Sequence, residues 1–210
     1  MTAPAVAELA EGALAFEAKL RALPGDLHAD WQRDADSPWA LLLQLPEGPA
    51  RERAAAGLFA AHCGPLPALP RLLDAAGAWV LQDRPTLTRL FCALAIARRP
   101  GVLRCCIEKS ARLALRAALG EWFGRLAALA PSGRGVPAQV AHWSPMHWAC
   151  IGYWDWATLL QPDDGPLRRL ARLSLPRGLL GTGAARGAAA PDWPAAQALA
   201  WLGEEEAVPC

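Results

Sequence analysis

The sequence has little charge, few lysines and no long unbroken apolar run. Charged residues make up 20% of its 210 residues, the net charge is +1, and the only lysines are Lys19 and Lys109. So small a net charge offers no general attraction to nucleic acid or to anionic lipid. The longest uncharged stretch, residues 135–154, is interrupted by Pro137 and Pro145, which argues against a transmembrane helix. We therefore expect no insertion into a membrane and no nucleic-acid partner.

Catalytic and cofactor motifs are also missing from the sequence. It contains no Gly-x-Ser-x-Gly elbow, phosphate-cradling loop, dinucleotide fingerprint or His-Glu-x-x-His. His142, His147 and Cys150 are the one cluster with metal-like spacing, but zinc needs three or four converging ligands and His142 precedes the break at Pro145. We interpret the three as structural residues and expect no enzyme, metal or cofactor. A small α-helical metal-dependent enzyme remains the alternative.

The six cysteines lack the regular spacing of a disulfide framework, and two of them, Cys105 and Cys106, are adjacent. The first residues lack the basic segment of a secretory signal. Reduced, buried thiols in a cytoplasmic protein are the interpretation that fits both observations.

Apolar residues recur at helical spacing along most of the chain, and no alternating pattern lasts long enough to predict a strand. Helices are expected over residues 3–23, with an end at Pro24-Gly25-Asp26, and from Pro38, with Ser37 as the N-cap. Further helices are expected at these places: 50–63, from Pro70, from Thr86 as N-cap, 102–130 as one long helix, 144–160, 167–173 and 193–202.

These elements predict an all-α protein with a single compact multi-helix domain. We expect that domain over residues 1–176, a flexible Gly/Ala-rich linker over 177–192, and a short C-terminal helix with an acidic tail over 193–210.

Charge is unevenly distributed along the chain. Residues 1–83 carry a net charge of −5, whereas residues 84–116 carry eight basic groups against Glu108 alone. The basic stretch is either a docking surface or an internal partner of the acidic N-terminal third. A nucleic-acid-binding helical protein is a further alternative. We predict partner contacts at six arginines: Arg98, Arg99, Arg112, Arg168, Arg169 and Arg172.

Four segments carry a likeness to a known family in their apolar positions, their tryptophans and their order. They are Leu27-His28 with Trp31, the stretch from Leu94 to Ile107, the Trp-rich helix from Trp148 to Leu160, and Leu170 to Pro176. On these segments the chain resembles the SctK (YscK-like) accessory proteins of bacterial type III secretion systems, especially those of plant-pathogen and Burkholderia-type systems. The resemblance spans roughly residues 27–176, and the Gly/Ala-rich segment that follows departs from it.

The resemblance implies a cytoplasmic component of the sorting platform beneath the injectisome. Such a protein bridges the pod protein SctQ and the cytoplasmic domain of the inner-membrane ring protein SctD. The resemblance also implies that the protein has no enzymatic activity and no cofactor. It further implies attachment to the inner membrane through protein partners alone.

Overall fold

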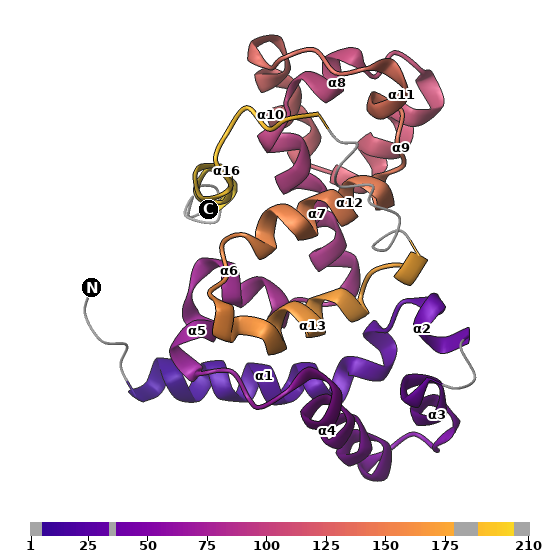
Figure 1. Cartoon of the computed structure of the whole chain (residues 1–210), viewed down its shortest axis with the longest axis vertical. Coiled ribbons are helices and arrows are strands. Elements are labelled where there is room, and N and C mark those ends of the chain that lie inside the picture. The colour runs from indigo at the N-terminus through magenta and orange to yellow at the C-terminus, as the bar shows by residue number, and fades with distance from the viewer. Residues whose placement is uncertain (1–5, 34–36, 179–188, 204–210) are drawn as a thin grey trace. The chain divides into compact units, whose positions relative to one another are not determined.

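The computed structural model describes residues 6–33, 37–178 and 189–203, and within these ranges every regular element is a helix (Figure 1). The prediction of an all-α fold is therefore confirmed. None of the described helices is long and apolar enough to cross a bilayer.

The described residues pack into two compact units. The first unit takes in the described residues of Met1–Leu87 and Leu160–Gly178, and the second unit those of Thr88–Leu159 and Leu179–Cys210. The predicted domain organisation, with boundaries at residues 176 and 192, is untested and stays a prediction.

The first unit packs around one long N-terminal helix, α1 (Val6–Asp26). Phe16, Leu20 and Leu23 lie on its buried side, and the ring of Phe16 meets that of Phe59 edge to face, with 5.5 Å between centroids. The remaining helical elements of this unit are α2 (Ala29–Arg33), α3 (Pro38–Gln44), α4 (Pro49–Cys63), α5 (Leu69–Leu73), α6 (Ala75–Ala78), η1 (Trp79–Leu81), η3 (Pro162–Asp164) and α13 (Gly165–Leu173).

The end predicted for α1 is wrong by three residues. The helix continues through Pro24 to Asp26, because a proline near a helix end removes only one hydrogen bond. The Asp26 carboxylate is buried, pairs with Lys19, and accepts the backbone N–H of Arg84 at 3.0 Å. Asp26 therefore satisfies the first turn of α7 (Arg84–Arg98) rather than capping the turn that follows it.

The predicted cap of α7 also needs correction. Thr86 lies inside the helix, and its N–H donates to the carboxylate of Asp83 at 2.8 Å. An aspartate three residues ahead of a helical N–H is a strong N-cap. The predicted start at Ser37-Pro38 is confirmed, since Ser37 is the N-cap residue of α3 and Pro38 its first residue.

The second unit takes in most of α7 and the helices that follow. Its other elements are α8 (Gly101–Cys105), α9 (Lys109–Leu119), α10 (Trp122–Leu129), η2 (Ala130–Ser132), α11 (Ala138–Ala141), α12 (Pro145–Ala157) and the C-terminal α16 (Ala195–Gly203). The predicted C-terminal helix is confirmed and begins two residues later than expected. Residues 179–188 of the predicted linker and the acidic tail at 204–210 lie outside the described residues.

Most residues of helix α12 are buried. Ser144 caps it by accepting the N–H of His147 at 3.3 Å, as the Ser-Pro start predicts. Trp148 and Trp156 are fully buried, and the ring of Trp156 lies 5.4 Å from that of Phe91 on α7. Gly152 faces the same helix so closely that an added Cβ would lie 1.7 Å from the Phe91 carbonyl oxygen. The two helix backbones are therefore almost in contact at this point.

The single long helix predicted over residues 102–130 is wrong. The chain forms α8, α9 and α10 instead, with breaks at residues 106–108 and at Gly120. Gly120 has φ +57° and ψ −128°, a backbone conformation that other residues rarely adopt and that glycine adopts without strain. Of the apolar positions behind that prediction, Leu115, Leu119 and Leu126 are fully buried, whereas Trp122 and Leu129 are only partly buried.

Candidate docking surfaces

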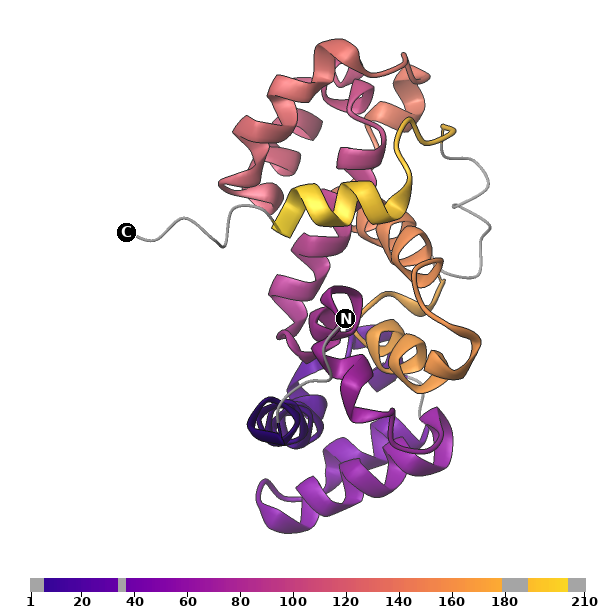
Figure 2. The same cartoon turned by 90° about the vertical axis from the view of Figure 1, so that its left-hand side faces the viewer.

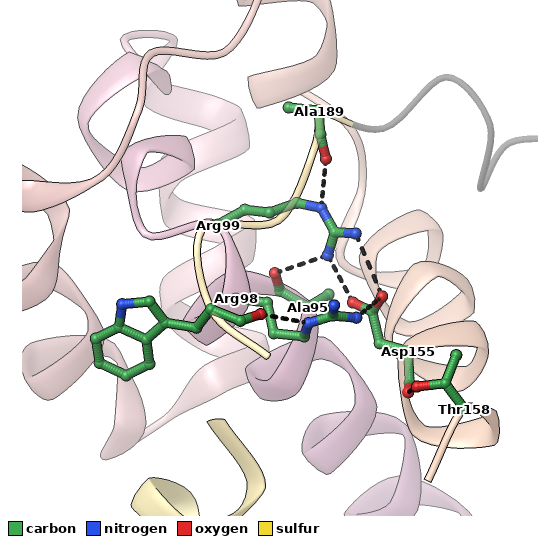
Figure 3. Close-up of polar contacts among 7 residues, drawn as sticks. Ala95, Arg98, Arg99, Asp155, Thr158 and Ala189 are labelled. Atoms are coloured by element: carbon green, nitrogen blue, oxygen red, sulfur yellow. Dashed lines mark hydrogen bonds and ion pairs between the residues drawn. The ribbon is translucent and has the colours of Figure 1, made fainter. Parts of the chain in front are cut away.

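Arg98 and Arg99, two of the predicted partner-binding residues, lie together at the end of α7 around one carboxylate (Figure 3). Asp155 of α12 accepts hydrogen bonds from both guanidinium groups, and its Oδ2 lies 2.6 Å from Nη1 of Arg99. Arg99 is 5% exposed and also donates to the Ala95 carbonyl at 3.4 Å. Burial lowers the pKa of the Arg98 guanidinium, and Asp155 opposes that shift. A buried and a partly buried cation thus share one anion.

The same two arginines bind the C-terminal segment, residues 189–203, to the rest of the second unit. The Nε–H of Arg99 donates to the carbonyl of Ala189 at 2.7 Å, and the Nε–H of Arg98 donates to that of Trp193 at 3.0 Å. The N–H of Asp192 in turn donates to the Arg98 carbonyl at 2.7 Å. These contacts are internal, so Arg99 has to leave Asp155 before it can bind a partner.

Aromatic contacts hold the other end of the C-terminal segment, which Figure 2 shows in yellow as it leads into α16. The guanidinium of Arg125 lies 4.3 Å from the ring centroid of Trp201 and 5.5 Å from that of Trp122. A cation over an aromatic face is attracted by the ring quadrupole. Ala195, Ala198 and Leu202, spaced as one helix face, are buried.

The three predicted arginines of α13 differ in their surroundings. Arg168 donates to the Gln161 carbonyl, and Arg169 donates to the Cys63 carbonyl at 2.8 Å. Arg172 is exposed and its guanidinium lies 5.7 Å from the ring centroid of Trp31. Arg172 therefore presents its charge to solvent, whereas Arg168 and Arg169 also hold backbone carbonyls.

A partly buried ion pair stabilises the start of α13. Asp164 accepts Nη2–H of Arg71 at 2.6 Å and the backbone N–H of Gln161 at 2.8 Å. The hydrogen bond from Arg71 lowers the pKa of the Asp164 carboxyl, so this carboxylate stays ionised and paired.

The sixth predicted residue, Arg112, lies on α9 and is exposed. Its Nη1–H donates to the Leu103 carbonyl at 2.8 Å, and its guanidinium lies 5.6 Å from the centroid of Phe123. The role of all six arginines in partner binding is untested and stays a prediction.

The three side chains with metal-like spacing have separate surroundings. Nε2 of His142 accepts the N–H of Glu108 at 3.3 Å, and Nδ1 of His147 lies 2.8 Å from the Ser144 hydroxyl. Cys150 is buried. Within the described ranges, no three His, Cys, Asp or Glu side chains gather in a way able to hold a metal ion.

The prediction of buried thiols can be tested by alkylation. Burial raises the pKa of the Cys92 and Cys150 thiols to about 12, and that of Cys63 to about 11. Cys105 is only partly buried, and its sulfur accepts the Val136 N–H at 3.5 Å. Because the thiolate is the reactive form, iodoacetamide at pH 8 is expected to label Cys105 at least about tenfold faster than Cys92 or Cys150. Peptide mass spectrometry over time measures the rates, and equal rates at the three sites would contradict the burial.

Asp155 and Phe123 organise these surfaces, and the site prediction included neither. Asp155 carries a signal, since it is the only charged residue between Gly135 and Gln161, and a carboxylate in a buried helix needs a partner. Phe123 carries none, because its role depends on the turn at Gly120 that brings α10 back toward α9.

Comparisons with known proteins found no relative of this chain. No family model matches the chain, and no curated protein and no solved structure is significantly similar to it.

Proposed function

We propose that the protein is a non-enzymatic adaptor of a type III secretion sorting platform, of the SctK type. In this role it links the pod protein SctQ to the cytoplasmic domain of the inner-membrane ring protein SctD. It works in the cytoplasm, is held at the inner membrane through these partners, and takes no cofactor.

The observation that carries the proposal is that the four segments behind the resemblance meet in pairs. In the first unit, the N–H of His28 donates to the Leu173 carbonyl at 2.9 Å. The indole N–H of Trp31 donates to the Leu175 carbonyl at 3.0 Å. The early His-Trp segment and the closing Leu-rich segment therefore contact each other.

The other two segments meet in the second unit. The stretch from Leu94 to Ile107 contains Arg98 and Arg99, and the Trp-rich helix contains their partner Asp155. Such pairs hold a fold together, because losing one partner leaves the other without its contact. The pairing supports the view that the shared positions mark a common framework.

The proposal is tested by co-expression with SctQ and with the cytoplasmic domain of SctD from the same secretion apparatus. We expect the protein to co-elute with each partner alone and to join the two in one complex on size-exclusion chromatography. If the protein bound neither SctQ nor the cytoplasmic domain of SctD, the adaptor role would be refuted.

Arg172→Glu tests whether α13 takes part. Arg172 is exposed, and the ring of Trp31 keeps a second cation, Arg177, at 5.5 Å, so the fold is expected to survive. Reversing one charge at the edge of an interface is expected to weaken binding about tenfold, equivalent to about 1.4 kcal/mol. Arg53→Glu on the exposed side of α4 makes the same change in net charge and is expected to leave binding unchanged. Equal effects of the two variants would show that α13 has no specific role.

A further inference from the structure

Helix α9 presents a basic and apolar stripe to solvent. Lys109, Arg112, Leu113 and Arg116 are all exposed, and their spacing of i, i+3, i+4 and i+7 places them on one side of the helix. Ile107, just before the helix, is 80% exposed, and Leu113 is 54% exposed. We call these five residues the α9 face. The α9 face therefore offers apolar and cationic contacts to the same ligand.

The ring of Phe123 supports both arginines of the α9 face, Arg112 and Arg116. Their guanidinium groups lie 5.6 Å and 5.7 Å from the centroid of the same ring, Phe123. The Nη1–H of Arg112 also donates to the Leu103 carbonyl at 2.8 Å. Stacked guanidinium groups lose less rotamer freedom on binding than free ones, and their remaining N–H groups match a carboxylate in fork geometry.

The α9 face is strongly biased to positive charge. The acidic residue at its start, Glu108, is engaged by the hydroxyl of Ser110 and lies 3.7 Å from Nδ1 of His142. One carboxylate against the three cations Lys109, Arg112 and Arg116 leaves this side of α9 with a net positive charge.

We propose that the α9 face binds an acidic amphipathic helix of a partner protein. Arg112 and Arg116 are four residues apart, so two carboxylates four residues apart on the bound helix meet one guanidinium each. An apolar side chain on the adjoining face of the bound helix covers Leu113 and Ile107. Free phosphate or duplex DNA supplies the anions but leaves these two aliphatic side chains uncovered.

An anionic membrane fits less well. Peripheral helices insert a broad apolar face into the bilayer, whereas α9 is 11 residues long and carries its other leucines, Leu115 and Leu119, in the core.

Fluorescence anisotropy with a synthetic probe tests the proposal on the full-length protein. The probe is a labelled helical peptide of about 20 residues with glutamates four residues apart and leucines on the adjoining face. We expect micromolar binding that weakens as salt is added, because the contact is partly ionic. A matched peptide with lysine in place of every glutamate is expected not to bind.

Two kinds of variant locate the contact. Arg112→Glu with Arg116→Glu is expected to weaken binding at least about tenfold. Arg33→Glu with Arg53→Glu makes the same change in net charge at exposed arginines of the first unit and is expected to change the affinity less than about twofold. Because Arg112 also holds a carbonyl, Ile107→Asp with Leu113→Asp provides a second test in which only exposed side chains change, and it too is expected to weaken binding at least about tenfold.

Three results would overturn the proposal: no binding of the acidic peptide, binding unaffected by the variants of the α9 face, or a preference of the two arginines for another ligand. The last is measured with phosphatidylserine vesicles and duplex DNA. Tighter binding of either one, lost in Arg112→Glu with Arg116→Glu, would assign the face to lipid or to nucleic acid instead.

Discussion

Gly152→Ala is expected to destabilise the second unit by about 3 kcal/mol or more, the upper range for overpacking a core. The added Cβ would lie 1.7 Å from the carbonyl oxygen of Phe91 and 2.5 Å from its carbonyl carbon. These are backbone atoms of α7, so no side-chain rotation relieves the clash and the two helices have to separate. Chemical denaturation followed by far-UV circular dichroism measures the loss.

Gly57→Ala is the matched control. Gly57 lies inside α4, is exposed, and has no atom within 4 Å of the position that a Cβ would take. Alanine there is expected to stabilise the protein by about 0.5–1 kcal/mol, because glycine costs backbone entropy in a helix. If both variants changed the stability by less than about 1 kcal/mol, the close approach of α7 and α12 would be disproved.

Asp155→Asn is expected to cost about 3–5 kcal/mol of unfolding free energy, the range for breaking a buried ion pair by removing one partner. The amide keeps the shape of the side chain but leaves the charges of Arg98 and Arg99 without an anion in a buried site. We also expect the C-terminal segment to loosen, since the same arginines hold the carbonyls of Ala189 and Trp193. Hydrogen exchange over residues 189–203 reports this loosening.

Glu17→Gln makes the same chemical change at an exposed ion pair. Nη2 of Arg21 lies 2.6 Å from Oε1 of Glu17, but both side chains are more than half exposed. Water screens such a pair, so a change of at most about 0.5 kcal/mol is expected. Asp155→Asn with as small an effect would mean that the Arg98–Arg99–Asp155 cluster contributes nothing to stability.

The sequence predicted helices well where local chemistry determines them. The start of α12 follows from Ser144-Pro145, because a serine hydroxyl and a proline at the first helical position both favour a helix start. Its lack of charge, apart from Asp155, agrees with the burial of most of its residues.

The apolar periodicity predicted the wrong helix boundaries at Gly120. The chain breaks there, but the same spacing of buried leucines continues on both sides of the break. Leu115, Leu119 and Leu126 keep a helical spacing across the turn at Gly120, so an apolar pattern alone predicts one continuous helix. The only local sign of the break is the glycine, which helices also tolerate at a modest cost.

The candidate surfaces were predictable only in part. The excess of arginine over residues 84–116 is visible in the sequence, and it left open whether these residues face a partner or pair with the acidic N-terminal third. In the structure Arg98 and Arg99 pair with Asp155, which lies outside that third, whereas Arg112 is exposed beside Leu113. Long-range pairs of this kind depend on the tertiary fold, which helical spacing does not encode.

The discontinuity of the first unit has a consequence for biosynthesis. Its last part, Leu160–Gly178, follows the whole of Thr88–Leu159 along the chain, and it supplies the partners of His28, Trp31 and Arg71. A ribosome translating about 5–20 residues per second therefore exposes an incomplete N-terminal part for several seconds before α13 emerges. Chaperones and proteases have access to the surface that α13 later covers during this interval, so a stalled or prematurely ended nascent chain is a better substrate for them than the finished protein.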